Sequence, residues 1–109
     1  MRSVPEGDWK KLRAMKNDVL NFACKRIFEK IDKISNDREG KEHKVYLNLW
    51  KLLDQEDDEI ALMFDDLKRS SAIHKLAAWK RNGVISKESF SEFSDETRKI
   101  VEALNETLR

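Results

Sequence analysis

Residues that break helices or build tight turns are scarce in this 109-residue sequence, which has one proline and three glycines. Few positions therefore favour the turns that a β-sheet requires. In contrast, 39% of the residues are charged and 39% are apolar, a balance typical of amphipathic helices. At about 100–150 residues per domain, we predict one all-α domain over residues 1–109, a helical bundle of about four main helices plus short helices.

Cysteine and long apolar runs are also lacking. Cys24 is the single cysteine, so the chain cannot close an internal disulfide or supply the thiolate pairs of a zinc site. No apolar run approaches the ~18 residues of a membrane span, and the first residues lack the apolar stretch of a signal peptide. We therefore expect a soluble, cytoplasmic protein with no membrane contact.

Motifs for catalysis are missing: there is no Gly-rich phosphate loop, Gly-x-Ser-x-Gly elbow or His-Glu-x-x-His step. Asp58 and Asp65 share a helix face, but neither His43 nor His74 follows a glutamate at the spacing of a di-iron site. Cys24 lies on an apolar stripe, which favours a core position. We predict a non-enzymatic protein with no catalytic residue, cofactor or metal. An enzyme would need a polar pocket near His74, which we expect to be partly buried, whereas His43 should be exposed.

Apolar residues at three- and four-residue steps predict two helices in the first third of the chain. The first spans residues 8–15 with Asp8 as its N-cap. The second spans residues 18–35, with Asn17 as a possible cap and Phe22 and Phe28 at the edges of its buried stripe. That stripe consists of Leu20, Cys24, Ile27, Ile31 and Ile34.

A polar turn over residues 36–40 should connect these helices to another long helix that begins at Glu42. The acidic run 54–59 is predicted to interrupt it, and a third helix should span residues 57–81 with a kink at Ser70 and Ser71.

Strong end signals follow. Gly83 is placed to take the left-handed C-cap position and Val84 to close that cap. Ser86 should cap a short helix, and Ser94 should cap the final one.

The two halves of the chain differ in charge. Residues 1–53 contain 13 Lys and Arg against 8 Asp and Glu, a net of +5, and residues 54–109 contain 9 against 13, a net of −4. This asymmetry is compatible with a basic nucleic-acid face, with a basic hairpin packed on an acidic one, or with head-to-tail pairing of two chains.

Aromatic residues are numerous for so small a bundle, with three Trp, one Tyr and five Phe. Tyr46, Trp50 and Trp79 border apolar helix faces, where amphipathic aromatics often anchor interfaces. We therefore predict an interaction module that uses these three residues to contact itself, as a homodimer, or another protein. Alternatively, they form the rim of the protein's own core.

The other functional hypothesis is a nucleic-acid-binding accessory protein. Its basic N-terminal segment, with Trp9, Lys10, Lys11 and Arg13, combines cationic side chains with an aromatic ring for stacking. A solvated helix face whose tryptophan packs on the bundle would give the same pattern.

Four segments carry a resemblance to known proteins: residues 8–13, 24–27, 64–70 and 93–98 (DWKKLR, CKRI, FDDLKRS and FSDETR). The chain resembles a family of small uncharacterised bacterial helical proteins, over most of its length. This resemblance implies a bacterial, cytoplasmic origin and no particular activity. Residues 76–90 also resemble a short helix-Gly-helix oligomerisation motif, although Ser89 separates Glu88 from Phe90 where the motif has them adjacent.

Overall fold

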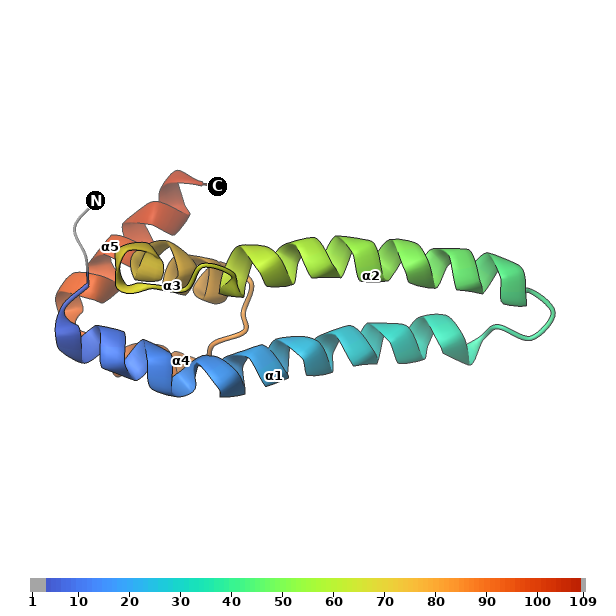
Figure 1. Ribbon diagram of the computed structural model, residues 1–109, viewed down its shortest axis with the longest axis horizontal. Helices are drawn as coiled ribbons and strands as arrows, with labels where there is room; N and C mark the ends of the chain where they lie inside the picture. Colours follow the sequence, from blue (N-terminus) through green and yellow to red (C-terminus); the bar gives the residue numbers. More distant parts are fainter. Residues whose placement is uncertain (1–3, 109) are drawn as a thin grey trace.

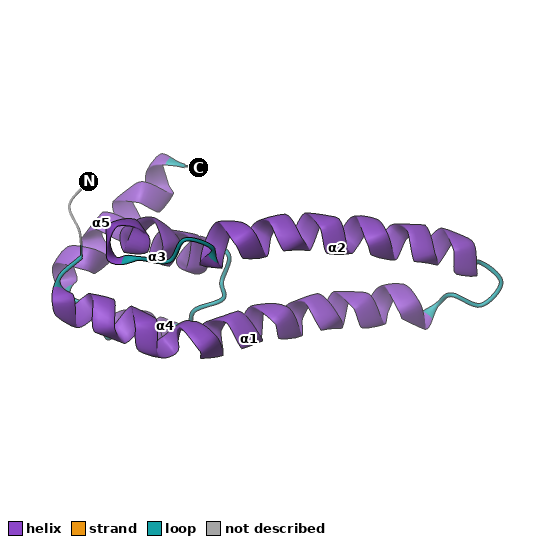
Figure 2. Ribbon diagram, in the orientation of Figure 1, coloured by secondary structure: helices purple, strands orange, loops and turns teal. Residues whose placement is uncertain are grey.

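A computed structural model describes residues 4–108, and the regular elements of this range are all helical (Figure 2). In chain order they are α1 (Glu6–Asn36), α2 (Glu42–Phe64), the 3-10 turn η1 (Arg69–Ser71), α3 (Ala72–Arg81), α4 (Lys87–Ser91) and α5 (Asp95–Thr107). Four of the five α-helices have seven residues or more, which confirms the predicted all-α class. Within the described range, no helix is both long and apolar enough to cross a bilayer.

The molecule is elongated, with dimensions of 54 × 24 × 22 Å. α1 and α2 form an antiparallel hairpin that projects from one end (Figure 1). The other end, which we call the head, contains α3, α4 and α5, the first half of α1 and the last turns of α2. We call the projecting part of the hairpin, residues 24–59, the arm.

α1 is one continuous helix, so the prediction of two helices separated at Asn17 is wrong. Asp8 and Asn17 lie inside this helix and are not its caps. An interior Asn or Asp costs only about 0.5 kcal/mol relative to alanine. Leu12 and Val19, on either side of Asn17, are both buried in the head. Their burial in one core favours a single helix by more than this local cost.

α2 also continues where a break was expected, through the acidic run 54–59. Most of its carboxylates are exposed and keep their hydration. The half-buried residues Leu52, Glu56 and Ile60 meanwhile recur at four-residue steps on the inner side of the helix. Glu56 forms an ion pair with Lys30 of α1, so a carboxylate in this run helps to hold the hairpin together.

The helix predicted over residues 57–81 is divided in the structure, between α2 and α3. Asp66 has a φ of +56°, which no α-helix accommodates. The Ser71 hydroxyl donates to the Asp66 carbonyl (2.7 Å) and accepts from the Lys68 N–H (3.1 Å). The sequence predicted only a kink at Ser70 and Ser71, caused by serine hydroxyls that bond backbone groups. The Ser71 hydroxyl does form such bonds, but the helix is fully broken, and the break begins a few residues earlier.

The predicted end of α3 is confirmed. Gly83 has a φ of +68°, and its N–H donates to the Lys80 carbonyl (3.2 Å) while the Val84 N–H donates to the Trp79 carbonyl (3.0 Å). These two bonds define a Schellman cap, and Val84 is buried as that cap requires.

The remaining end signals are confirmed as well. Gly40, in the turn between α1 and α2, has a φ of +83°. The Ser86 hydroxyl accepts from the Ser89 N–H (3.1 Å), and the Ser94 hydroxyl accepts from the Thr97 N–H (3.4 Å).

The core of the head surrounds Trp79, which is 0% exposed. Leu12 of α1 and Val101 of α5 are enclosed with it, and the Phe64 ring centre lies 5.5 Å from the Trp79 ring. The indole N–H of Trp79 donates to the Met63 carbonyl (3.0 Å). Because the last carbonyls of a helix lack partners within it, this bond caps α2 from the side.

Replacing Trp79 should therefore reduce the free energy of unfolding in two steps. Trp79→Phe leaves the Met63 carbonyl without its donor and should cost about 1–2 kcal/mol. Trp79→Ala also opens a cavity and should cost about 3–5 kcal/mol. Urea unfolding followed by circular dichroism measures both, and the exposed Phe28→Ala should stay within about 0.5 kcal/mol of the wild type. Equal stability of Trp79→Ala and the wild type would contradict this description of the core.

Candidate interaction surface

Apolar side chains line the outer side of α2 in the arm. Tyr46, Leu47, Trp50 and Leu53 are 55%, 52%, 60% and 38% exposed. At 3.6 residues per turn, the steps between them place all four within an arc of about 120°. We call these four residues the arm face.

The same helix carries a second apolar side, which packs toward α1. Val45, Leu49 and Leu52 are half-buried, and Ile60 contacts the head core. α1 covers this inner side, and the four arm-face residues remain exposed. A helix that has two apolar sides but only one neighbouring helix can bury one of these sides, and the second side faces water.

The aromatic rings of the arm lie in a row. The His43 and Tyr46 ring centres are 6.5 Å apart with the planes 21° apart, and Tyr46 and Trp50 are 6.5 Å apart with an edge-to-face angle of 85°. Such contacts favour fixed side-chain orientations. The structure therefore brings two of the three predicted interface residues, Tyr46 and Trp50, together on one exposed side of α2, next to an exposed His43 as expected.

The third predicted interface residue, Trp79, is placed wrongly by the sequence argument. It lies in the centre of the head with no exposed area and is bonded to the end of α2. The apolar residues within 73–79 have the same spacing as those of a helix that lies at the protein surface. Contacts from α1, α2 and α5 enclose this helix on several sides, and these contacts are not visible in its local spacing.

Phe22 and Phe28 of α1, which were expected to widen a buried stripe, are both exposed. Phe28 adds an apolar ring to the other helix of the arm. The exposure of apolar residues on α1 and on α2 has the same cause. Two helices in contact each bury one narrow stripe of side chains, and apolar residues outside that stripe stay exposed.

A polar contact joins the base of the arm to the head: the Arg26 guanidinium donates to the Asn82 carbonyl (2.7 Å) at the end of α3. Lys30 and Glu56 form an ion pair within the arm and join its two helices. The first contact ties the base of the arm to the α3–α4 turn.

The basic N-terminal residues do not form one free surface. Trp9 packs partly against the core, and the Arg13 guanidinium lies over its ring at 5.4 Å. Lys10 faces Glu6 (3.9 Å), and the Lys11 ammonium donates to the Glu92 carbonyl (2.5 Å). The Trp9 ring is therefore half-buried, with the Arg13 guanidinium over it, and nucleic-acid binding stays an untested prediction.

Potentially reactive side chains lie apart from one another. Cys24 is half-buried in the arm, and His74 is exposed, which corrects the expectation of a partly buried imidazole. His74 lines a groove on the head together with mainly aliphatic residues, among them Leu62, Leu104 and Leu108. The described part of the chain holds no group of three His, Cys, Asp or Glu side chains suited to a metal ion.

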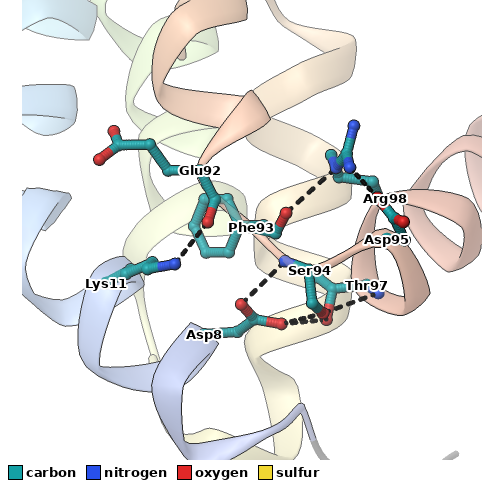
Figure 3. Close-up of polar contacts among 8 residues, drawn as sticks. All are labelled: Asp8, Lys11, Glu92, Phe93, Ser94, Asp95, Thr97 and Arg98. Atoms are coloured by element: carbon teal, nitrogen blue, oxygen red, sulfur yellow. Dashed lines mark hydrogen bonds and ion pairs between the residues drawn. The ribbon is translucent and has the colours of Figure 1, made fainter.

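A buried carboxylate, not anticipated from the sequence, joins the two ends of the chain (Figure 3). Asp8 is 3% exposed. Its Oδ1 accepts from the Ser94 N–H (3.0 Å), and its Oδ2 accepts from the Ser94 and Thr97 hydroxyls (2.6 Å each). These donors lie at the N-terminus of α5, where the helix dipole also favours negative charge. Nearby, Lys11 bonds the Glu92 carbonyl, as Figure 3 shows.

The hydrogen bonds control the ionisation of Asp8. Burial acts to raise the pKa of this carboxyl, but the Ser94 hydroxyl, the Thr97 hydroxyl and the Ser94 N–H, aided by the charge of Lys11, outweigh it and lower the pKa. Asp8 is therefore ionised and fully engaged. Its role is structural: it holds the start of α1 against the start of α5.

Comparison of the chain with protein-family models, with curated proteins and with solved structures found no match. The fold and the exposed surface define a class only: an all-α protein with a helical head and a projecting two-helix arm. The residues that resemble a helix-Gly-helix oligomerisation motif lie in the head, where Leu76 and Phe90 are buried in the chain's own core.

Replacing Asp8 should make stability less dependent on pH. A carboxyl whose pKa is lowered by folding contributes fully above its ordinary value of 3.8 and loses that contribution as the pH falls through the lowered value. Asp8→Asn should lower the free energy of unfolding by about 2 kcal/mol at neutral pH. The difference from the wild type should then narrow toward zero in strong acid.

Urea unfolding at several pH values between neutrality and strong acid measures this difference. The matched control is Asp95→Asn, an exposed carboxylate in the same region whose partner is Arg98; it should change stability by only about 0.5 kcal/mol. A difference for Asp8→Asn that is the same at every pH would contradict the role assigned to its charge.

Proposed function

We propose that this protein is a small non-enzymatic interaction module that binds another protein chain through the arm face. The observation that carries the proposal is the exposure of Trp50, Tyr46 and two leucines on one side of a helix that packs a different side against α1. Burying such side chains is favourable by about 25 cal/mol per Å² of apolar area removed from water.

The composition of the arm face suits a protein partner. Tyr and Trp supply large contact areas with few rotatable bonds and are enriched among the residues that dominate binding energy. Charged side chains such as Lys44, Lys51 and Asp54 lie along one flank of these apolar residues. An apolar centre with a polar rim is the usual arrangement of protein interfaces.

The shape of the molecule supports the same proposal. The head contains the enclosed core. The arm projects from it as an elongated surface (Figure 1), and the buried core residues lie outside the arm. A helix projecting in this way can be approached along its length by another helix. We place this activity in the cytoplasm, where reducing conditions suit a core that is held by packing and a single unpaired Cys24.

Photo-cross-linking tests the proposal in cells that produce the chain naturally. With p-benzoylphenylalanine in place of Trp50, irradiation should yield a covalent adduct with a protein chain, because the probe is enclosed in an interface. The matched control is the same probe at Asn48, which is exposed on the opposite side of α2. The same probe is then placed at Tyr46, Leu47 and Leu53. The absence of adducts from all four arm-face positions, or an adduct yield from Asn48 equal to that from Trp50, would overturn the proposal.

A further inference from the structure

We propose that the partner of the arm face is a second copy of this chain, paired antiparallel through α2 around a twofold axis at Trp50. This inference rests on the proposed function of the arm face and specifies its occupant. It is carried by three features of α2: the symmetry of its exposed positions, the distribution of its charges and the length of the arm.

Two pairs of exposed positions in α2 are symmetric about Trp50, whereas Tyr46 has Asp54 at the matching distance. Leu47 and Leu53 lie three residues before and after it, and His43 and Asp57 lie seven residues before and after it. In a twofold contact between antiparallel helices, each residue lies level with the residue at the same distance on the other side of the axis. The pairing therefore sets Leu47 level with Leu53 of the second copy, on opposite flanks of the contact, and sets His43 level with the carboxylate of Asp57.

The side on which each residue lies is also compatible. At about 100° per residue, Tyr46 and Leu53 fall on the same flank of Trp50, and the twofold axis keeps that flank common to both chains. Tyr46 of one copy then packs beside Leu53 of the other, and each half-exposed ring gains an aliphatic neighbour. The two Trp50 rings meet at the centre, where interface residues contribute most to affinity.

On the other flank, the charges toward the two ends of the arm complement one another in the antiparallel arrangement, while the two Lys51 side chains lie near the axis. Lys44 lies toward the tip of the arm and Asp54 and Asp58 lie toward the head, and none of the three forms an ion pair within the described chain. Antiparallel pairing places Lys44 of each copy beside Asp54 and Asp58 of the other. Parallel pairing would instead set the acidic ends side by side, which disfavours that orientation.

The length of the arm fits the same register. Ten residues separate Trp50 from Gly40 in the turn at the tip, and ten separate it from Ile60, which contacts the head core. Two antiparallel arms centred at Trp50 can thus lie along each other until each tip reaches the level of the other head. The result is a four-helix arrangement in which both arms gain the neighbour that each lacks alone.

Sedimentation equilibrium of the full chain, from low micromolar to millimolar concentration, tests the association. The mass should rise to twice the 12.9 kDa of one chain. Trp50→Ser should weaken association on the order of 30-fold or more, whereas the control Asn48→Ser should leave it unchanged. A mass that stays at one chain throughout, or association that Trp50→Ser does not weaken, would overturn the inference.

Disulfide trapping tests the register. In a Cys24→Ser background and at millimolar concentration, which offsets the weaker association of a Trp50 variant, Trp50→Cys should form a covalent dimer on mild oxidation, because the twofold axis brings that position against itself. Asn48→Cys, on the opposite side of α2, should remain largely monomeric. Equal trapping at both positions would contradict the proposed symmetry axis.

Charge reversal tests the orientation. Lys44→Glu and Asp58→Lys should each weaken association several-fold, and the double variant should recover most of it because each copy again offers opposite charges. Circular dichroism checks that each exposed substitution leaves the helices intact. Failure of the double variant to recover association would count against antiparallel pairing.

The outcomes separate this inference from the proposed function. If the chain stays monomeric but the probe at Trp50 cross-links a different protein, the arm face is an interaction surface and the second copy is the wrong occupant. If the chain stays monomeric and no adduct forms, both proposals fail. An adduct of two identical chains, together with the doubled mass, supports both.

Discussion

A helix can bury its apolar side only against a neighbour, and the arm of this protein provides one neighbour for each of its two helices. α1 and α2 therefore cover one narrow stripe on each other, while the apolar arc of α2 is wider than that stripe. In the head the same two helices meet α3 and α5 and are enclosed. The contrast between an enclosed head and a half-covered arm underlies the arm face and the functional proposal based on it.

The head gives that arm a fixed direction through a few polar contacts. Asp8 bonds the start of α5, so the first turn of α1 is held against the C-terminal helix. At the base of the arm, Arg26 bonds the Asn82 carbonyl. Charge-assisted hydrogen bonds of this kind are directional, so they orient the hairpin as well as stabilise it. An apolar contact alone would leave more freedom for the arm to swing.

Local chemistry predicted the helix ends from residue 83 onward, but it placed the start of α1 wrongly at Asp8 and predicted helix continuity poorly. Gly83, Ser86 and Ser94 cap the elements that their residue types indicated, because a cap depends on only a few neighbouring residues. Asn17 and the run 54–59 were misread as breaks, since propensity differences of about 0.5 kcal/mol per residue are smaller than the gain from packing a continuous stripe. Of the predicted interface residues, Tyr46 and Trp50 are exposed and Trp79 is buried.

Residue types and short spacings are enough to establish the helical class, the turn at Gly40 and the C-cap at Gly83. Which apolar sides are covered depends instead on which helices lie beside them. Trp79 and Trp50 occur in similar local patterns, yet Trp79 lies on a helix that α1, α2 and α5 enclose, and Trp50 faces water. Burial depends on what the rest of the chain places beside a residue. That is a property of packing between distant segments, just as the meeting of Asp8 with Ser94 is.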